Sequence, residues 1–181
     1  MDGVGGTRPE AVVSLDAALV ARARDGDRGA FGRLYDRFAP MVHGLLLARV
    51  RHADVDDLVH DVFLAAMRRL DTLRDPDAFG PWLAAIARNR ARDHHRRARD
   101  AEPLAAEVAD PSPPHAEAHA ALAAIRSLPE AYRETLVLRL VEGMTGPEIA
   151  ERTGLTHGSV RVNLHRGMRL LRQALAGRPP A

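Results

Sequence analysis

The chain has 181 residues, and its 26 basic residues, all arginine, face 24 acidic ones, so the formal net charge is only +2. This length accommodates one domain or two small ones. The absence of cysteine excludes a disulfide framework, a cysteine-ligated zinc finger and a thiol nucleophile. The uncharged apolar stretches are far shorter than the ~20 residues of a membrane span, and residues 1–10 lack the apolar core of a signal peptide. We therefore expect a cytoplasmic protein.

Composition indicates the fold class. Alanine and leucine dominate, whereas valine, isoleucine and threonine together supply only 23 residues. Because alanine and leucine lose little on entering a helix and β-branched residues favour strands, we expect an all-α protein. We expect two helical domains joined by a flexible linker. The predicted ranges are a disordered tail at 1–13, a first domain at 14–99, a linker at 100–119, a second domain at 120–175 and a disordered tail at 176–181.

Apolar residues in the first domain recur at spacings of three and four, the period of one helix face. One such helix runs from Phe31 to Leu45, and another begins near Asp54. The second carries four aspartates in or near its first turns, where the helix dipole stabilises negative charge. Residues 71–80 form a predicted polar loop, and Pro81 suits the first turn of the next helix.

The helix that follows Pro81 changes from apolar to basic along its length. Between Arg88 and Arg99 it carries six arginines and one aspartate, a local charge of +5. A charge run is commonly no more than a solvated face. Here the excess is unbalanced and continues a core-forming helix, which favours contact with phosphates. Residues 100–119 then become rich in alanine, proline and glutamate, which is typical of a linker.

Capping boxes predict helix starts in the second domain at Ser127–Glu130 and at Thr145–Glu148. After the second box, a turn at Gly154 and a further helix complete a helix-turn-helix pattern. That last helix has no acidic residue from Thr156 to Arg172, which suits contact with DNA. We therefore expect the second domain to be a helix-turn-helix (winged-helix-like) DNA-binding domain. Between the boxes, four residues are predicted to share one apolar face: Tyr132, Leu136, Leu140 and Val141.

Three stretches in this order resemble bacterial sigma factors of the extracytoplasmic-function (ECF) group, within the primary-type sigma family. They are residues 53–64 (ADVDDLVHDVFL), residues 79–97 (FGPWLAAIARNRARDHHRR), and Leu128-Pro129-Glu130 with the helix-turn-helix from Met144 to Leu171. The resemblance covers roughly residues 14–175. It implies an alternative RNA polymerase sigma factor that binds core polymerase, recognises the −35 and −10 promoter elements and promotes strand opening. The first domain would be sigma region two and the second sigma region four.

The resemblance implies that region two docks on the clamp helices of the largest polymerase subunit through Asp57, His60 and Asp61. Helix capping is the alternative interpretation of this aspartate cluster. Capping explains Asp54 and Asp56 well, and it explains Asp61 poorly because that residue lies a full turn further into the helix.

The resemblance also implies that region two binds the upper strand of the −10 element. Loop 71–80 and Asn89 would form a pocket for a base flipped out of the stack, and an amide suits this pocket because it both donates and accepts hydrogen bonds. The alternative for Asn89 is a plain surface position. Phe79 is either a stacking residue or part of the core. The complete predicted −10 set is Asn89, Phe79, Arg88, Arg92, Arg96 and Arg97.

Region four would read the −35 element with the last helix. Val160 and Leu164 should face the core, which leaves the intervening residues to approach DNA. Arginine pairs bidentately with guanine, asparagine with adenine, and a valine methyl can meet thymine. We expect Arg169 and Arg172 to contact phosphate or solvent. The predicted −35 set is Arg161, Val162, Asn163, His165 and Arg166.

His115 and His119 are four residues apart, but Ala116 stands where a zinc-protease motif needs glutamate, so we expect no metal and no cofactor. No nucleophile–base pair or phosphate loop is evident, so we expect no enzyme. The expected partners are core polymerase, promoter DNA (duplex at −35, single-stranded at −10) and an anti-sigma factor that could hold the chain at the membrane, with no small-molecule substrate. Two alternatives stay open: a stand-alone helix-turn-helix regulator with a helical sensor domain, and a pure interaction protein.

Overall fold

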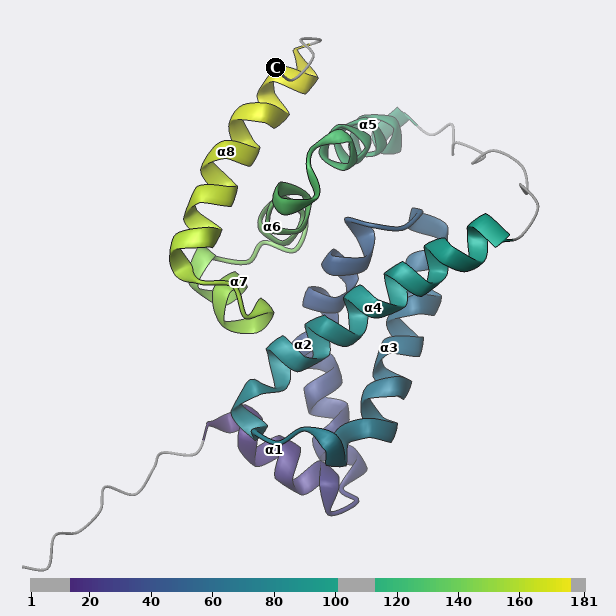
Figure 1. Cartoon of the computed structure of the whole chain (residues 1–181), viewed down its shortest axis with the longest axis vertical. Coiled ribbons are helices and arrows are strands. Elements are labelled where there is room, and N and C mark those ends of the chain that lie inside the picture. Colours follow the sequence, from purple (N-terminus) through teal and green to yellow (C-terminus); the bar gives the residue numbers. More distant parts are fainter. Residues whose placement is uncertain (1–13, 101–112, 177–181) are drawn as a thin grey trace, which may run out of the picture.

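The computed structural model describes residues 14–100 and 113–176, which are almost entirely helical (Figure 1). The predicted tails at 1–13 and 177–181, and the linker segment 101–112, lie outside the described residues. The described part contains no strand, which confirms the all-α fold class and leaves the helix-turn-helix without a β wing. Within these same ranges no helix combines the length and the hydropathy that crossing a bilayer requires.

The first domain, residues 14–100, packs α1 and α3 against α2 and closes the bundle with α4 (Figure 1). Ser14 and Asp27 begin the first two helices, and each side chain accepts a backbone N–H three residues on, from Ala17 and Ala30 respectively. The predicted polar loop at 71–80 holds two short 3-10 turns. The elements are α1 (Leu15–Arg24), α2 (Arg28–Leu47), η1 (His52–Asp54), α3 (Val55–Arg69), η2 (Leu70–Thr72), η3 (Pro76–Ala78) and α4 (Phe79–Asp100).

The second domain, residues 113–176, contains the predicted helix-turn-helix as α7 and α8. The Thr145 capping box is present: the Thr145 hydroxyl accepts the Glu148 N–H, and the Glu148 carboxylate accepts the Thr145 N–H. Gly154 ends α7 in the left-handed conformation (φ +77°), which favours glycine. The elements are α5 (Pro113–Ser127), α6 (Glu130–Leu140), α7 (Gly146–Thr153) and α8 (His157–Leu175).

Three local predictions in this region are wrong. Ser127 does not cap α6; it ends α5, where its hydroxyl donates to the Ala124 carbonyl at 2.7 Å, because α5 continues through it. Helix α5 also begins at Pro113, inside the predicted linker. Leu140 and Val141 are 47% and 51% exposed, because α6 ends there and the chain turns away from the core.

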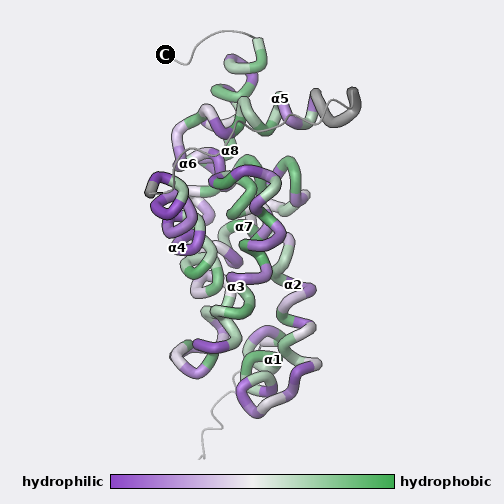
Figure 2. Tube along the Cα trace, turned by 90° about the vertical axis from the view of Figure 1, so that its right-hand side faces the viewer, coloured by the Kyte–Doolittle hydropathy of each residue, from purple (hydrophilic) through white to green (hydrophobic). Residues whose placement is uncertain are grey.

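The two domains pack directly against each other, and their buried apolar residues form one continuous cluster. Helix α2 contacts α6, and α4 contacts α7 (Figures 1 and 2). Gly44 lies at a close approach between α2 and α6: a Cβ there would lie 2.8 Å from the Leu138 Cδ2 and from the Glu142 Cγ. The domains that the sequence suggested were loosely tethered therefore adopt a closed arrangement.

A buried carboxylate ties this closed arrangement together. Glu134 of α6 is only 7% exposed and lies between two arginines of the first domain. It accepts from the Arg49 Nη2 at 2.8 Å and from the Arg88 Nε at 3.2 Å. Burial opposes ionisation of Glu134. The hydrogen bond and charge of Arg88, aided by Arg49, outweigh it and hold the pKa below its ordinary value.

A second interdomain pair, between His43 and Glu142, should stabilise the closed arrangement more at low pH than at high pH. The lowered pKa of Glu134 has the opposite effect, because it favours the closed arrangement at high pH. The His43 Nδ1 lies 2.7 Å from the Glu142 Oε1, and this hydrogen bond raises the pKa of His43 above its usual 6.5, with a smaller contribution from the Asp56 charge. A group with a raised pKa stabilises the closed form fully below its ordinary pKa and loses that contribution as the pH rises through the raised value. Because His43 is only half-buried, the loss should be less than about 1 kcal/mol.

Energy transfer between two dyes measures this effect. The chain has no cysteine, so Arg28→Cys and Leu175→Cys label one exposed position on each domain. Transfer in this dye pair should fall as the pH rises above 6.5, and His43→Gln should flatten the fall. An equal fall in the His43→Gln chain would contradict the assignment.

Candidate functional site

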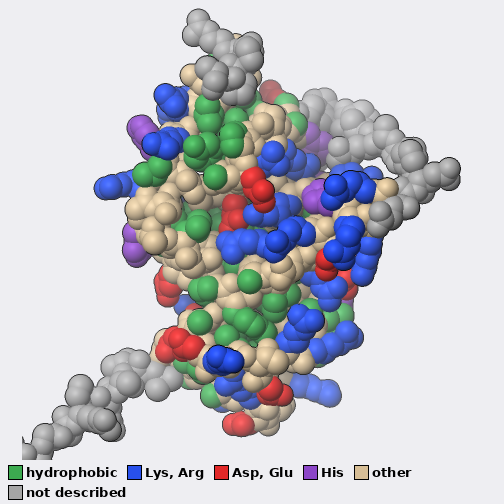
Figure 3. All heavy atoms as spheres, in the orientation of Figure 1, with side chains coloured by type: hydrophobic (Ala, Val, Ile, Leu, Met, Phe, Trp, Pro, Cys, Tyr) green, Lys and Arg blue, Asp and Glu red, His purple; other side chains and the backbone are tan. Residues whose placement is uncertain are grey.

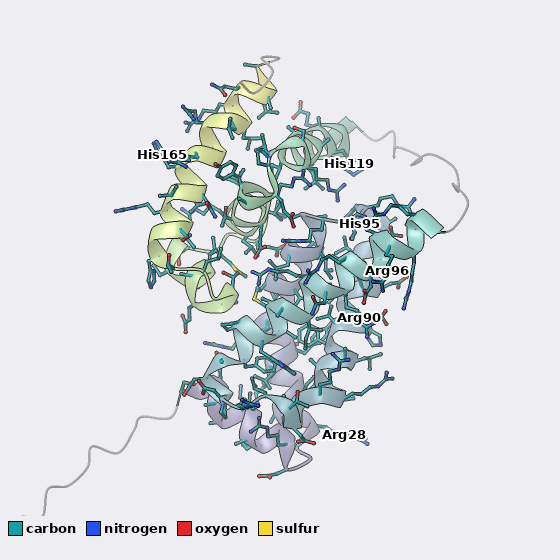
Figure 4. The ribbon with its side chains drawn as sticks, viewed as in Figure 1. Arg28, Arg90, His95, Arg96, His119 and His165 are labelled. Atoms are coloured by element: carbon teal, nitrogen blue, oxygen red, sulfur yellow. The ribbon has the colours of Figure 1, made fainter. Side chains whose placement is uncertain are left out.

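Helix α8 presents the predicted −35 residues to solvent. Arg161, His165 and Arg166 are exposed, Val162 is 41% exposed and Asn163 is half-buried. Val160 is buried, as predicted, so it fixes which side of α8 faces outward. His165 points away from the rest of the second domain (Figure 4). The Thr156 hydroxyl caps the helix by accepting the Ser159 N–H at 3.1 Å. The structure thus brings these side chains onto one accessible helix at the end of a capped turn.

The basic half of α4 forms a second exposed surface, which Figures 2 and 3 show as strongly hydrophilic and rich in arginine. Arg92, Arg96 and Arg97 are exposed there, and Asn89 is exposed beside them. The Asn89 Oδ1 accepts from the Arg92 Nη2, so the two predicted −10 residues already contact each other. Four of the six predicted −10 residues therefore lie together on the surface.

The other two members of the −10 set lie elsewhere. Arg88 donates to Glu134 and also to the Thr153 carbonyl at 3.4 Å, so in the closed arrangement its guanidinium is engaged in the contact between the domains. Phe79 is fully buried, with its ring centroid 5.0 Å from that of Phe38 and 5.9 Å from that of Trp82. Of the two interpretations open for Phe79, the structure favours the core.

The predicted polymerase-binding residues form an exposed acidic surface on α3. Asp57, His60 and Asp61 are all exposed, and none has an ion pair or hydrogen bond to another described side chain. Asp54 differs, because it pairs with Arg51 at 3.0 Å and with His94 at 3.2 Å. The aspartate cluster is therefore divided: Asp54 stabilises the first domain, while the three predicted docking residues are available to a partner.

Sequence reasoning missed Glu134 and Arg49, which join the domains. A signal for Glu134 was present: it is the one charged residue directly before the apolar run from Thr135 to Leu138. A carboxylate next to a buried run needs a partner, and Glu134 pairs with two arginines.

Among the described residues no group of histidines, cysteines and carboxylates could hold a metal ion. The His119 ring lies edge-on to the His52 ring, with 6.2 Å between the ring centroids. The His115 side chain lies outside the described part.

Comparison with known proteins identifies the two domains. Residues 34–101 match the family model for sigma-70 region 2, and residues 118–171 match that for sigma-70 region 4. The RNA polymerase sigma factor CarQ of Myxococcus xanthus is 37% identical over 164 residues, covering 85% of this chain and 94% of CarQ. The ECF RNA polymerase sigma-E factor of Haemophilus influenzae is 31% identical over 175 residues, covering 86% of this chain and 93% of that factor.

A solved structure is similar over nearly the whole chain. The structure of CnrH in complex with the cytosolic domain of CnrY superposes with a TM-score of 0.67 at 30% identity, covering 91% of this chain and 99% of CnrH. The order of domains, the exposed arginine-rich α4 and the capped helix-turn-helix agree with these matches. The chain therefore belongs to the ECF group of the sigma-70 family, and it acts in transcription initiation as an alternative RNA polymerase sigma factor.

Proposed function

We propose that the two domains divide promoter recognition between them. The second domain reads the duplex −35 element with Arg161, Val162, Asn163, His165 and Arg166 of α8. The first domain binds the single-stranded −10 element along α4 and the polymerase clamp along α3. The observation that carries this proposal is α8, a capped recognition helix whose exposed face has no acidic residue.

The first domain contributes phosphate contacts and one pocket for a base. Arg92, Arg96 and Arg97 neutralise backbone phosphates, which position the strand without reading its sequence. Asn89 receives the extruded base, and the hydrogen bonds of its amide offset the few kcal/mol that flipping costs. Arg88 joins this set only when Glu134 releases it, because it lies in the closed interface. Engagement of the complete −10 set therefore requires the domains to separate.

A protein partner controls this sigma factor. CnrH, which is similar over nearly the whole chain, was solved with the cytosolic domain of CnrY bound to it. We propose an equivalent partner here, an anti-sigma factor that holds the chain inactive. The sigma factor works in the cytoplasm beside its polymerase, and it needs no cofactor and performs no catalysis of its own.

Run-off transcription with purified core polymerase tests the proposed function. Core polymerase alone should start at no defined position, and addition of this chain should produce accurate starts at its own promoters. Specific duplex binding by the chain without polymerase, together with no accurate initiation, would instead support a stand-alone regulator. Sequencing of transcript starts after overexpression in the native host would supply the promoter sequences for the assay.

Reversing one charge on α3 should weaken polymerase binding. Asp61 is exposed and has no ion pair or hydrogen bond to another described side chain, so Asp61→Arg should leave folding intact and place a repulsive charge against the clamp. We expect at least about tenfold weaker co-purification with core polymerase, equivalent to about 1.4 kcal/mol. Asp25→Arg makes the same charge change at an exposed turn between α1 and α2 and should have little effect. Undiminished co-purification of the Asp61→Arg chain would contradict the docking assignment.

Two arginines of α8 should differ in what they contribute to −35 binding. Arg161→Ala should relax base preference at one position, because a bidentate arginine–guanine pair contributes about 1–3 kcal/mol of discrimination. Arg172→Ala should weaken binding evenly across sequences and reduce the salt dependence, as expected of a phosphate contact. The two effects are separated by measuring how tightly the full chain, bound to core polymerase, binds duplexes that carry different −35 sequences. The measurement is repeated at several salt concentrations. Identical behaviour of both variants would refute the division of roles.

A further inference from the structure

A basic cleft lies between the domains, where the C-terminal half of α4 faces the start of α6. Its volume is about 660 Å³. Figure 4 shows His95 and Arg96 on this half of α4, on the part of the helix nearest α5, and Figure 3 shows arginine gathered along it. The residues that line the cleft come from the end of α2, from α4 and from the start of α6: Arg49, Arg92, His95, Arg96, Ala98, Arg99, Glu130 and Arg133.

The charge of this lining is strongly unbalanced. Five guanidinium groups face one carboxylate, an excess of four positive charges even with His95 neutral. The single carboxylate, Glu130, is 73% exposed and lies 3.4 Å from Arg49. Salt screens the repulsion between the guanidinium groups only at separations greater than the Debye length, which is about 8 Å at physiological ionic strength. Outside the lining, Glu134 pairs with Arg49 at 2.8 Å and Asp93 pairs with Arg96 at 3.0 Å. The closed arrangement therefore leaves positive charge without a carboxylate partner on the other three lining arginines, among the side chains that the structure describes.

Three of the five arginines donate to neutral oxygens. Arg92 donates to the Asn89 Oδ1, Arg99 to the His95 carbonyl at 3.4 Å, and Arg133 to the Leu128 carbonyl. Among the side chains that the structure describes, no carboxylate pairs with these three guanidinium groups. Their remaining N–H groups are donors for an anion with several oxygens, since arginine binds phosphate in a bidentate, charge-assisted manner.

We propose that this cleft binds a compact polyphosphate: a chain of linked phosphoryl groups, either inorganic or the tail of a nucleotide. The positive groups that line the cleft come from both domains and surround one hollow, whereas the arginines proposed to follow the −10 strand lie along α4 alone. Arg90 and Arg97, on the same helix, do not line it. Several linked phosphates match both the charge excess and the confined volume better than a single small anion does.

The ligand stabilises the closed arrangement. Arg49 belongs to the first domain and Arg133 to the second, so the complete site exists only while the domains are together. A ligand that binds one conformation shifts the equilibrium toward it by mass action. The bound polyphosphate also occupies Arg92 and Arg96, so it competes with the −10 strand. This last consequence rests on the proposed function, whereas binding itself does not.

Calorimetric titration of the full chain with inorganic tripolyphosphate, without DNA or polymerase, tests the site directly. We expect one ligand per chain, bound much more tightly than orthophosphate. Replacing Arg99 and Arg133 together with Gln should weaken binding at least about tenfold, because two charge-assisted contacts are lost. Arg68→Gln with Arg69→Gln removes the same charge from the exposed end of α3, away from the cleft, and should leave binding unchanged. Tripolyphosphate should also raise energy transfer in the dye pair.

Two further arms distinguish the sources of the ligand. Equal affinity for tripolyphosphate and ATP would show that the cleft recognises the phosphate chain alone. Tighter binding of ATP would show that the natural ligand is a nucleotide. Both outcomes support the proposal. Equal losses in the two double variants would show general electrostatic attraction and overturn it. It is also overturned if a single-stranded oligonucleotide binds the cleft and tripolyphosphate does not displace it. Because the titrations with tripolyphosphate and ATP contain neither promoter DNA nor polymerase, their failure leaves the proposed function untouched.

Discussion

Replacing Glu134 with Gln should separate the two domains. The glutamine keeps the shape of the side chain but removes the charge that balances Arg49 and Arg88, whose side chains are only 13% and 27% exposed. Removing one partner of a buried ion pair costs roughly 3–5 kcal/mol, since the remaining charges stay desolvated without compensation. Energy transfer in the dye pair should fall, and urea should unfold the variant in two steps where the parent shows one.

An exposed glutamate on the same helix provides the control. Glu130 contacts the same Arg49 at 3.4 Å, but its side chain is 73% exposed. Glu130→Gln should therefore change stability by less than about 1 kcal/mol and leave energy transfer unaltered. If Glu134→Gln stayed as compact as Glu130→Gln, the buried pair would not hold the domains together.

Acid should reproduce part of the Glu134→Gln effect. A carboxyl whose pKa is depressed on folding stabilises the closed form above its unfolded pKa, near 4.5, and loses that contribution as the pH falls through the folded value. The interface should therefore weaken below pH 4.5, and the variant should lack this dependence. In the open form Arg88 is released, so Glu134→Gln should also bind single-stranded −10 DNA more tightly than the parent.

Replacing Phe79 with Ala should cause the largest loss of stability in the first domain. Phe79 is fully buried and packs between Phe38 and Trp82. Truncation of a buried phenylalanine typically costs about 3–5 kcal/mol, because apolar contacts are lost and a cavity remains. Chemical unfolding of the full chain should show a lower midpoint with an unchanged slope.

Phe79→Leu separates packing from base stacking. Leucine preserves most of the buried volume and should cost less than about 1.5 kcal/mol, but it offers no ring for a base. If Phe79 serves the core, this variant should open promoters as the parent does. A near-native Phe79→Leu chain that failed to open promoters on core polymerase would restore the stacking interpretation.

Local sequence signals were sufficient to predict which segments are helical and which surfaces carry charge. Apolar residues at spacings of three and four, the Thr145 capping box and Gly154 are local signals, and the structure confirms the helices that they predict. The sequence also predicted that one face of α8 and the basic half of α4 are exposed, because a mainly polar and charged helix face gains little from burial. Ser127 misled because a capping pattern does not show whether the preceding helix has already ended.

The division of these surfaces between stability and function depends on tertiary contacts. Arg88 and Arg92 are both arginines of one basic run, yet Arg88 is held by Glu134, 46 residues away, while Arg92 stays exposed. The burial of Glu134, the joining of the two domains and the convergence of arginines on one cleft all depend on contacts between distant parts of the chain. Periodicity and composition report on neighbours along a helix, so they carry no information about which distant side chain completes an ion pair.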